Sequence, residues 1–160
     1  MVELVQLRSP EWQRLRSIRL RALRDAPDAF GSTFEEAITW SAETWSDQLR
    51  TLPIVVAVKD GADVGMARYA PDDTRARTGW LISWWVAPAA RRMGVGSALT
   101  DAIIELARAA GVTRLLLDVA DGNAAATALY EVKGFAPNGE IGSLPPPRTH
   151  VREHQRERRI

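Results

Sequence analysis

The sequence predicts a single α/β domain with a mixed β-sheet, and three observations favour this fold class. Strand and helix patterns follow one another in the order strand, helices, three strands, helix, strand, helix, strand, which indicates an α/β arrangement. The length of 160 residues fits one domain with a substantial core, and contents of 46% apolar and 26% charged residues are ordinary for a globular protein. Since no repeat or internal linker divides the chain, we expect one domain over residues 1–160.

The first fifty residues predict one strand followed by helices. Residues 2–7 alternate weakly between apolar and polar side chains and favour a strand. Residues 10–24 predict a helix, because a serine and a proline stand at its start and apolar residues recur at helical spacing. Residues 25–31 contain proline and glycine and predict a turn. A capping-box pattern then opens a short helix over 32–38, and a serine caps a helix over 41–50.

The middle of the chain predicts three strands. Residues 54–59 and 64–69 are apolar runs joined by the sequence Asp-Gly-Ala-Asp at 60–63, which is a hairpin signal. After a polar loop over 72–78, residues 80–86 form a run that is apolar on both faces. Such a run predicts a central strand, covered on both sides of the sheet.

The last third predicts two helices and further strands. Residues 95–110 form the strongest amphipathic helix pattern, and residues 114–119 predict a buried strand. Asn123 is the expected cap of a helix that ends near residue 132, and an extended segment starts at 134–137. Residues 148–160 carry five arginines and two glutamates, a local charge of 5 − 2 = +3, so we expect a solvated edge strand or a frayed end.

The junction after the strand at 80–86 predicts an anion-binding site. A proline follows the strand, then the pattern Arg91-x-x-Gly94-x-Gly96, and then the strong helix begins. The first amides of a helix have no partners within it, and the helix dipole adds partial positive charge there. Glycines at 94 and 96 would remove side chains that keep a phosphate away from these amides. The pattern therefore predicts a cradle for a pyrophosphate.

Composition narrows the classes of function. The absence of cysteine excludes thiol catalysis, disulfides and thiolate metal sites, and the two histidines in one polar segment make a histidine metal site unexpected. A net charge of +1 gives no global field for nucleic acid or membrane, and no Gly-Lys-Ser/Thr pattern of a P-loop is present. The first ten residues lack the apolar core of a signal peptide, and no apolar run approaches the roughly 20 residues that span a bilayer. We therefore expect a cytoplasmic protein without metal.

Two motifs in order resemble the GNAT superfamily of acyl-CoA N-acetyltransferases, and the resemblance covers roughly residues 2 to 140. The sharper motif is Val86-x-Pro88-x-x-Arg91-x-x-Gly94-x-Gly96-x-x-Leu99. The second motif comprises Leu117-Asp-Val119, Asn123, Ala126, Leu129-Tyr130 and Gly134-Phe135. In addition, residues 20–36 resemble the acceptor region of one subgroup. A lone Gly-x-Gly is a weak signal, whereas two ordered motifs on the expected elements are specific.

The resemblance implies the family's fold and its co-substrate, acetyl-CoA. The fold would be a central, mixed and mostly antiparallel sheet of about six to seven strands, splayed at the cofactor site and flanked by about four helices. The pantetheine arm would lie along the strand before the cradle and bond to its backbone. The residues that the resemblance assigns to acetyl-CoA are Trp84, Trp85, Val86, Arg91, Arg92, Met93, Gly94, Val95, Gly96, Ser97, Asn123 and Tyr130.

The implied chemistry needs an acid and a base. Tyr130 matches the general acid that protonates the leaving thiolate, and a backbone amide near Val86 could stabilise the oxyanion. Many family members carry a glutamate in the strand before the cradle, but the strand at 80–86 has no acid. The base is therefore open between Asp118, the pair Glu35 and Glu36, and water alone.

These features predict an N-acetyltransferase in which a primary amine attacks acetyl-CoA directly in a ternary complex. The expected acceptor wall is Phe30, Phe34, Glu35 and Glu36, and the acceptor is a small-molecule amine or a protein N-terminus. A non-catalytic acyl-CoA-binding or sensing domain is the alternative, because the strand glutamate is missing. Nucleic-acid binding through residues 148–160 is a third hypothesis. One basic patch of this size is a weak indication of a nucleic-acid-binding surface, so we expect no nucleic-acid partner. A homodimer is left open.

Overall fold

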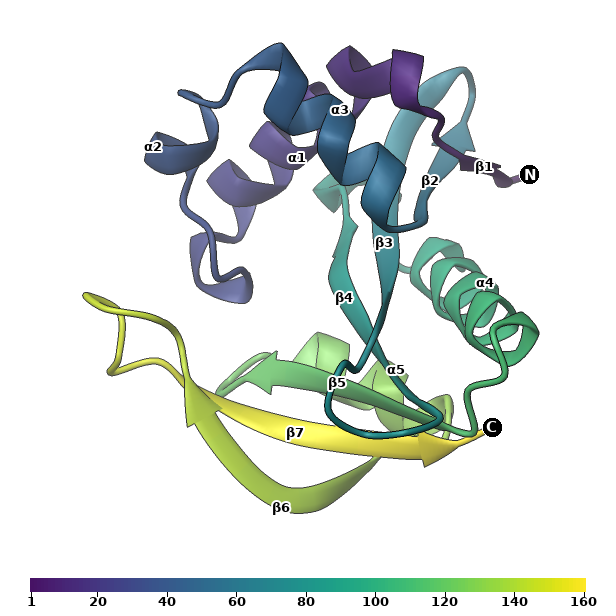
Figure 1. The fold of residues 1–160 in the computed structure, drawn as a ribbon, viewed down its shortest axis with the longest axis vertical. Coiled ribbons are helices and arrows are strands. Elements are labelled where there is room, and N and C mark those ends of the chain that lie inside the picture. The colour runs from purple at the N-terminus through teal and green to yellow at the C-terminus, as the bar shows by residue number, and fades with distance from the viewer.

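The computed structural model describes residues 1–160 as one seven-stranded mixed sheet with helices on both faces (Figure 1). The strands are β1 (Glu3–Gln6), β2 (Ile54–Lys59), β3 (Ala62–Pro71), β4 (Thr78–Val86), β5 (Arg114–Ala120), β6 (Ala136–Ser143) and β7 (Arg152–Arg159). The helices are α1 (Trp12–Asp25), α2 (Phe34–Ala37), α3 (Ala42–Thr51), α4 (Val95–Ala109) and α5 (Ala124–Val132), with 3-10 turns η1 (Ser9–Glu11), η2 (Pro27–Ala29) and η3 (Pro88–Ala90).

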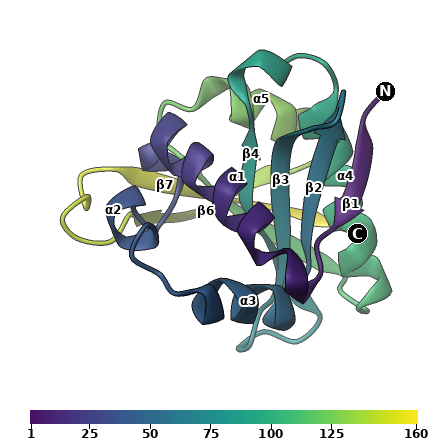
Figure 2. The same cartoon turned by 90° about the horizontal axis from the view of Figure 1, so that it is seen from above.

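The strands lie in the order β1-β2-β3-β4-β5-β7-β6, and only β4 and β5 run parallel. This confirms the predicted mixed, mostly antiparallel sheet, with five α-helices instead of about four. β4 occupies the middle position, as its apolar sequence predicts. In Figure 2, α1 crosses in front of β3 and β4, and α4 packs on the other side of β2 to β4.

Two separate cores pack against the two faces of the sheet. On one face, α4 and α5 pack with β-strand residues such as Val55 and Leu117. On the other face, α1 to α3 pack with residues such as Val56 and Met66. Since neighbouring residues of a strand point to opposite faces, Val55 and Val56 divide between the two cores. The sheet is therefore buried on both sides over its central strands.

The sheet splits between β4 and β5. Their parallel pairing covers only Thr78↔Arg114, Gly79↔Leu115 and Trp80↔Leu116. Further along β4, Ser83 has a φ of 55° and lies where the register with β3 shifts. A positive φ is uncommon in a residue with a side chain, so this is a strained bulge that bends the strand. The arrangement confirms the splay that the family resemblance implies.

The expectation of an edge strand or frayed end over residues 148–160 is wrong. β7 lies inside the sheet, between β5 and β6, and Arg156 in its middle is only 7% exposed. The Arg156 guanidinium donates to the Phe135 carbonyl at 3.0 Å and to Glu131 at 3.1 Å. A polar strand can be covered here because its charged groups find partners under α5. The sheet ends instead at β6, whose residues are almost all exposed.

Candidate active site

A cavity of about 620 Å³ lies where the N-terminus of α4 meets α5, the end of β4 and the end of α1. Nine of the residues assigned to the cofactor by resemblance line it: Trp84, Trp85, Val86, Arg91, Arg92, Gly94, Gly96, Ser97 and Asn123. The others in that set, Met93, Val95 and Tyr130, do not contact it. At its far end the cavity reaches Asp25, Ala26 and Ala29, on the other side of the sheet.

The N-terminus of α4 opens into this cavity without a side-chain cap. Gly94 is the residue before the helix, with φ 81° and ψ 0°, and no side chain accepts a hydrogen bond from the first turn. The next bond in the helix runs from Ala98 N–H to the Gly94 carbonyl, so the preceding amides of Val95, Gly96 and Ser97 keep free donors. A Cβ on Gly94 would meet nothing within 4 Å. The site therefore offers donors and positive dipole to an anion.

A glycine is required at position 96 by side-chain packing, which the sequence did not indicate. A Cβ at this position would lie 2.5 Å from the Trp84 ring and 3.1 Å from Leu129. The Trp84 indole also donates to the Gly96 carbonyl at 3.4 Å. Gly96 thus allows the indole to pack on α4 and form one wall of the cavity.

Arg91 fixes the turn before α4. Its Nε donates to the Val86 carbonyl at 3.0 Å, and its guanidinium forms an ion pair with Asp25 at the end of α1. Asp25 also accepts a bond of 2.9 Å from the Trp85 indole. The charge of Arg91 is therefore already paired within the protein, although the side chain lines the cavity.

The neighbouring positions differ in what they offer. Arg92 is exposed, has a φ of 62° and lines the cavity. Met93 is 52% exposed, and its sulfur contacts Lys59 Nζ at 3.2 Å. Val95 is 1% exposed, so only its backbone amide can serve a ligand. Asn123 caps α5 by accepting from Ala126 N–H at 3.3 Å and also lines the cavity.

Tyr130 lies in the core directly behind the cavity wall. It is 4% exposed, and its ring meets the Trp84 ring edge-on at 5.7 Å and the Phe135 ring at 6.0 Å. Burial raises the pKa of the phenol well above its usual range. The hydroxyl is therefore protonated at neutral pH.

Asp118 lies on the opposite face of β5 from Tyr130. Its neighbours Leu117 and Val119 pack in the same core as Tyr130, so the Asp118 side chain points to the other side. Asp118 does not line the cavity, and it pairs with Gln155 of β7. Partial burial raises the pKa of its carboxyl, and the hydrogen bond with Gln155 opposes that shift.

Glu153 of β7 is a neighbour of Asp118 that sequence reasoning missed. Burial raises its pKa, and the charge of Asp118 raises it further while Arg148 lowers it. The two acids therefore share one side of the sheet. No sequence pattern could have paired them, because the register of β7 on β5 joins positions more than thirty residues apart.

The expected acceptor wall lies beside the cavity but does not line it. Phe30 is 4% exposed, and the Arg19 guanidinium stacks on its ring at 4.6 Å. Phe34 lies under Arg24 at 4.3 Å. Glu35 is exposed, and the Glu36 carboxylate accepts from Thr33 N–H in the capping box of α2.

Arg148 joins the loop between β6 and β7 to residues 27–31, which include Ala29 at the far end of the cavity. Arg148, between β6 and β7, donates to the carbonyls of Pro27 at 2.6 Å, Phe30 at 3.0 Å and Gly31 at 2.9 Å. The same loop reaches toward the η2 segment in Figure 1. Because the sequence shows only an arginine in a proline-rich polar stretch, this contact could not be predicted.

Two features bear on other classes of site. No group of three or more histidine, aspartate or glutamate side chains is arranged to hold a metal ion. None of the helices combines the length and the apolar character that crossing a membrane requires.

Comparison with known proteins gives a consistent set of relatives. The model of the acetyltransferase (GNAT) family matches residues 10–135. The chain is 38% identical over 122 residues to a mycothiol acetyltransferase of Beutenbergia cavernae, covering 76% of this chain and 40% of the relative. It is 33% identical over 98 residues to an aminoglycoside N(6')-acetyltransferase type 1 of Klebsiella aerogenes, covering 58% of this chain and 64% of the relative. The chain thus spans less than two thirds of these relatives.

Solved structures share the fold over the full chain. A ribosomal-protein-alanine N-acetyltransferase of Brucella melitensis superposes with a TM-score of 0.81 at 24% identity, covering 99% of each chain. A structure from Salmonella typhimurium, described as a putative acetyltransferase with its cofactor acetyl-CoA, gives 0.76 at 19% identity, covering 99% of this chain and 93% of the other. At these sequence identities, the similarity shows a shared fold, which is the same arrangement of helices and strands.

Proposed function

Since the chain belongs to the acetyltransferase (GNAT) family, we propose that it moves an acetyl group from acetyl-CoA to a primary amine. The observation that carries this proposal is the uncapped N-terminus of α4, which opens into a cavity that reaches both sides of the split sheet. The curated relatives are likewise described as acetyltransferases, and their acceptors differ.

The residues present fit acetyl-CoA. The amides of Val95, Gly96 and Ser97 would hold the pyrophosphate, with Arg92 beside them. Beyond Trp80, β4 has no ladder partner on the side of β5, so its backbone is open to an extended chain such as pantetheine. When bound, acetyl-CoA supplies an acetyl thioester with a thiolate leaving group.

Direct transfer would use a backbone amide at the gap and side chains that lie just outside the cavity lining. A backbone N–H at Val86 would stabilise negative charge on the acetyl oxygen while the amine nitrogen bonds to the acyl carbon. As the carbon–sulfur bond breaks, the Tyr130 phenol behind the Trp84 wall would give its proton to sulfur through a water or after the Trp84 ring moves. Asp118 or water would take the proton from the amine, with the base acting from the other face of β5.

A non-catalytic acyl-CoA-binding domain is the second candidate. The acid that lines the cavity is Asp25, and its carboxylate already bonds to Arg91 and Trp85. A protein that only senses acyl-CoA would need no free base there. This candidate predicts binding of acetyl-CoA without transfer to any amine.

The test is acetyl-CoA binding by calorimetry, followed by thiol release on the same sample with a panel of amines. Binding with release supports the transferase. Tight binding without release favours the sensing domain or a protein acceptor outside the panel. Absence of binding contradicts the cradle.

Gly94→Glu tests the cradle directly. Its side chain would place a negative charge where a phosphate is expected, so affinity for acetyl-CoA should fall by about 100-fold or more, as for the loss of two charge-assisted hydrogen bonds. Gly139→Glu on β6 is the matched control, since Gly139 also has a positive φ (89°) and open space around its Cβ. Equal affinity in the two variants would sink the assignment.

The class of acceptor, the cellular location and the oligomeric state also belong to this proposal. A small-molecule amine and a protein N-terminus are both compatible with the cavity. A cytoplasmic location remains a prediction from the sequence, and a homodimer is left open as before.

A further inference from the structure

Arg19 of α1 and Arg68 of β3 lie beside one another on the sheet face covered by α1 to α3. Both line one small hollow, together with Gln48 and Ser83. Burial lowers the pKa of each to about 10, and the charge of Arg68 lowers that of Arg19 further. Two like charges are therefore held close together at partly buried positions.

Neither guanidinium has an acid as partner. Other partly buried arginines do pair with carboxylates, as in Arg14 with Asp63 at 2.7 Å and Arg156 with Glu131 at 3.1 Å. Arg19 and Arg68 form no ion pair, and Arg19 Nη1 and Arg68 Nε are sealed from solvent without a hydrogen-bond partner. A buried charged donor without a partner is costly, so native proteins rarely leave one in place.

The contacts that these arginines do make hold them in position. Arg68 Nη2 donates to the Gln48 carbonyl at 2.6 Å, in the last turn of α3. The Arg19 guanidinium stacks on the Phe30 ring at 4.6 Å. Both groups are thus fixed while one donor of each stays unused. Preorganised donors of this kind bind an anion at little entropic cost.

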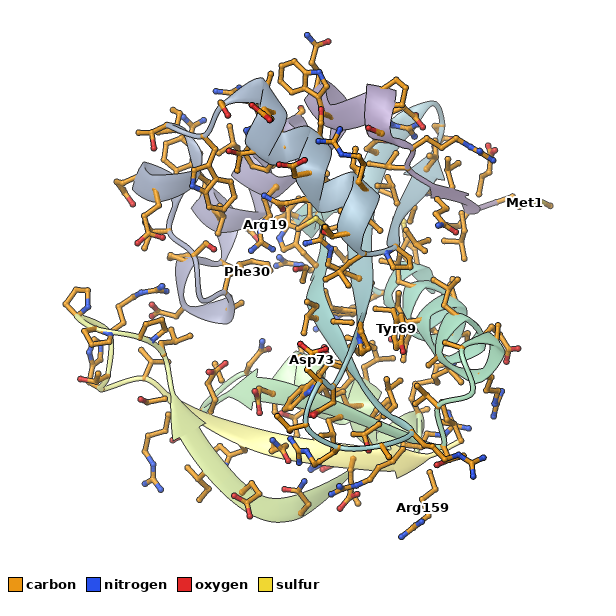
Figure 3. The ribbon with its side chains drawn as sticks, viewed as in Figure 1. Met1, Arg19, Phe30, Tyr69, Asp73 and Arg159 are labelled. Atoms are coloured by element: carbon orange, nitrogen blue, oxygen red, sulfur yellow. The ribbon has the colours of Figure 1, made fainter.

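The pair lies next to the cavity described above. Phe30 follows Ala29, which lines that cavity, and Figure 3 shows Arg19 and Phe30 adjacent on the inner side of the helical layer. The hollow between the arginines has a volume of about 10 Å³, enough for one water-sized group such as a carboxylate oxygen. The hollow also adjoins the cavity along β4, because Ser83 lines the hollow and the next residue, Trp84, lines the cavity.

We propose that Arg19 and Arg68 bind a carboxylate of the acceptor, so that the acceptor is a small amine that also carries a carboxylate, as a free amino acid does. This inference rests on the proposed function, because it names the acceptor of the same site. Guanidinium groups match carboxylates in charge and geometry, and the bound carboxylate would supply the partner that the chain lacks.

The experiment compares free amino acids with their C-terminal amides, for example alanine, methionine and phenylalanine, as acceptors in thiol release. The free acids should have a kcat/KM at least about tenfold higher, the effect of one charge-assisted hydrogen bond. Arg19→Met should remove this preference mainly through KM, and Arg19→Lys should restore part of it. Arg16→Met, on the same helix and at a side chain that forms no hydrogen bond or ion pair, should leave the preference intact.

A second readout needs no acetyl-CoA. Calorimetry and thermal unfolding of the protein alone should show binding and stabilisation by the free acids and not by the amides. Arg19→Met should lose that response while unfolding at the same or a higher temperature, because it removes an unpaired buried charge. A merely structural arginine would instead lower the unfolding temperature when replaced.

The outcomes separate this inference from the function on which it rests. If amines are acetylated but acids and amides react equally, the carboxylate site is wrong and the transferase stands. If chloride alone stabilises the protein through Arg19 without an acid–amide difference, the pair holds an inorganic anion and the acceptor claim fails. If acetyl-CoA does not bind, the proposed function fails, and calorimetry with the free acids still decides the carboxylate site. If no free acid binds or reacts, the inference is overturned.

Discussion

The Tyr130 phenol stays protonated throughout the neutral range, because burial beside Trp84 and Phe135 raises its pKa. As a general acid it should therefore be ready for each turnover. Tyr130→Phe should lower kcat by about 100-fold, a typical share for acid catalysis, and change affinity for acetyl-CoA by less than about twofold. Thiol release and calorimetry measure the two quantities.

The matched control for this variant is Tyr69→Phe. Tyr69 is also buried, at 7% exposed, and belongs to the same core, but it lies on β3, whereas Tyr130 packs edge-on against Trp84 of the cavity wall. Loss of the Tyr69 hydroxyl should leave kcat unchanged. Unchanged turnover in Tyr130→Phe as well would remove Tyr130 as the acid.

Asp118 gives a pH-dependent prediction. Burial raises the pKa of its carboxyl, and a base works only when deprotonated, so activity should rise with pH through that raised pKa. In the pH profile of kcat/KM, the ascending limb should have an apparent pKa above that of an ordinary aspartate, which is about 3.9. Asp118→Asn should remove the limb and lower the rate by about 100-fold. A limb that persists in this variant would assign the base to Glu153 or to the amine itself.

Single residues show where sequence reasoning succeeds and where it stops. Gly94 could be predicted, since the motif places it before the helix and its backbone needs the left-handed region. The packing role of Gly96 could not, because it depends on where the Trp84 ring lies. Arg19 and Arg68 resemble any arginines in an arginine-rich chain, and only the fold reveals that both lack a carboxylate.

At the level of elements, the loop between β6 and β7 is held by Arg148 against the η2 segment. Arg148→Ala would remove three hydrogen bonds, to the carbonyls of Pro27 in η2 and of Phe30 and Gly31 just after it. We expect KM for the acceptor to rise about tenfold and the free energy of unfolding to fall by about 1–3 kcal/mol, with acetyl-CoA affinity unchanged. Steady-state kinetics, denaturation and calorimetry test each part.

Arg152→Ala is the control for the Arg148 variant. Arg152 begins β7, is exposed and makes no side-chain hydrogen bond or ion pair, so its loss removes the same charge without freeing the loop. Equal kinetics in the two variants would show that charge alone matters. Faster hydrogen exchange over residues 144–151 in Arg148→Ala alone would confirm that the loop has been released.

Strands were predicted well where their side chains are apolar and poorly where they are charged. The run at 80–86 indicates a central strand because apolar residues on both faces need two covering layers. The charged residues of β7 indicate solvent, yet Arg156 is buried because Phe135 and Glu131 supply its partners. Those partners belong to a different segment, so no local pattern could place β7 inside the sheet.

For the whole molecule, β7 joins β6 to the rest of the sheet. Removal of residues 148–160 should therefore abolish cooperative unfolding, because it uncovers one edge of β5 and detaches β6. Removal of residues 1–5, which carry most of the edge strand β1, should leave a cooperative transition at a lower temperature. Circular dichroism during heating compares the two. A folded protein without residues 148–160 would contradict the internal position of β7.

The fold class follows from the order of elements, since alternating strands and helices require a sheet covered on both faces. The strand order β5-β7-β6 does not follow from that pattern, because two successive strands could also lie in chain order. The family resemblance implied the splay between β4 and β5, and the short pairing at Thr78 to Trp80 realises it.

The bridge made by Arg148 has a consequence for how such a protein could change over evolution. The α4 end of the cavity is built from β4 and the first turn of α4, which also carry the core, whereas its other end includes Ala29 of η2, which the β6–β7 loop contacts through Arg148. These two loops touch each other but contribute no strand to the sheet. Surface connections tolerate replacement far better than core elements do. A new acceptor preference could therefore arise from paired exchanges in two short loops, with the machinery for the thioester left intact.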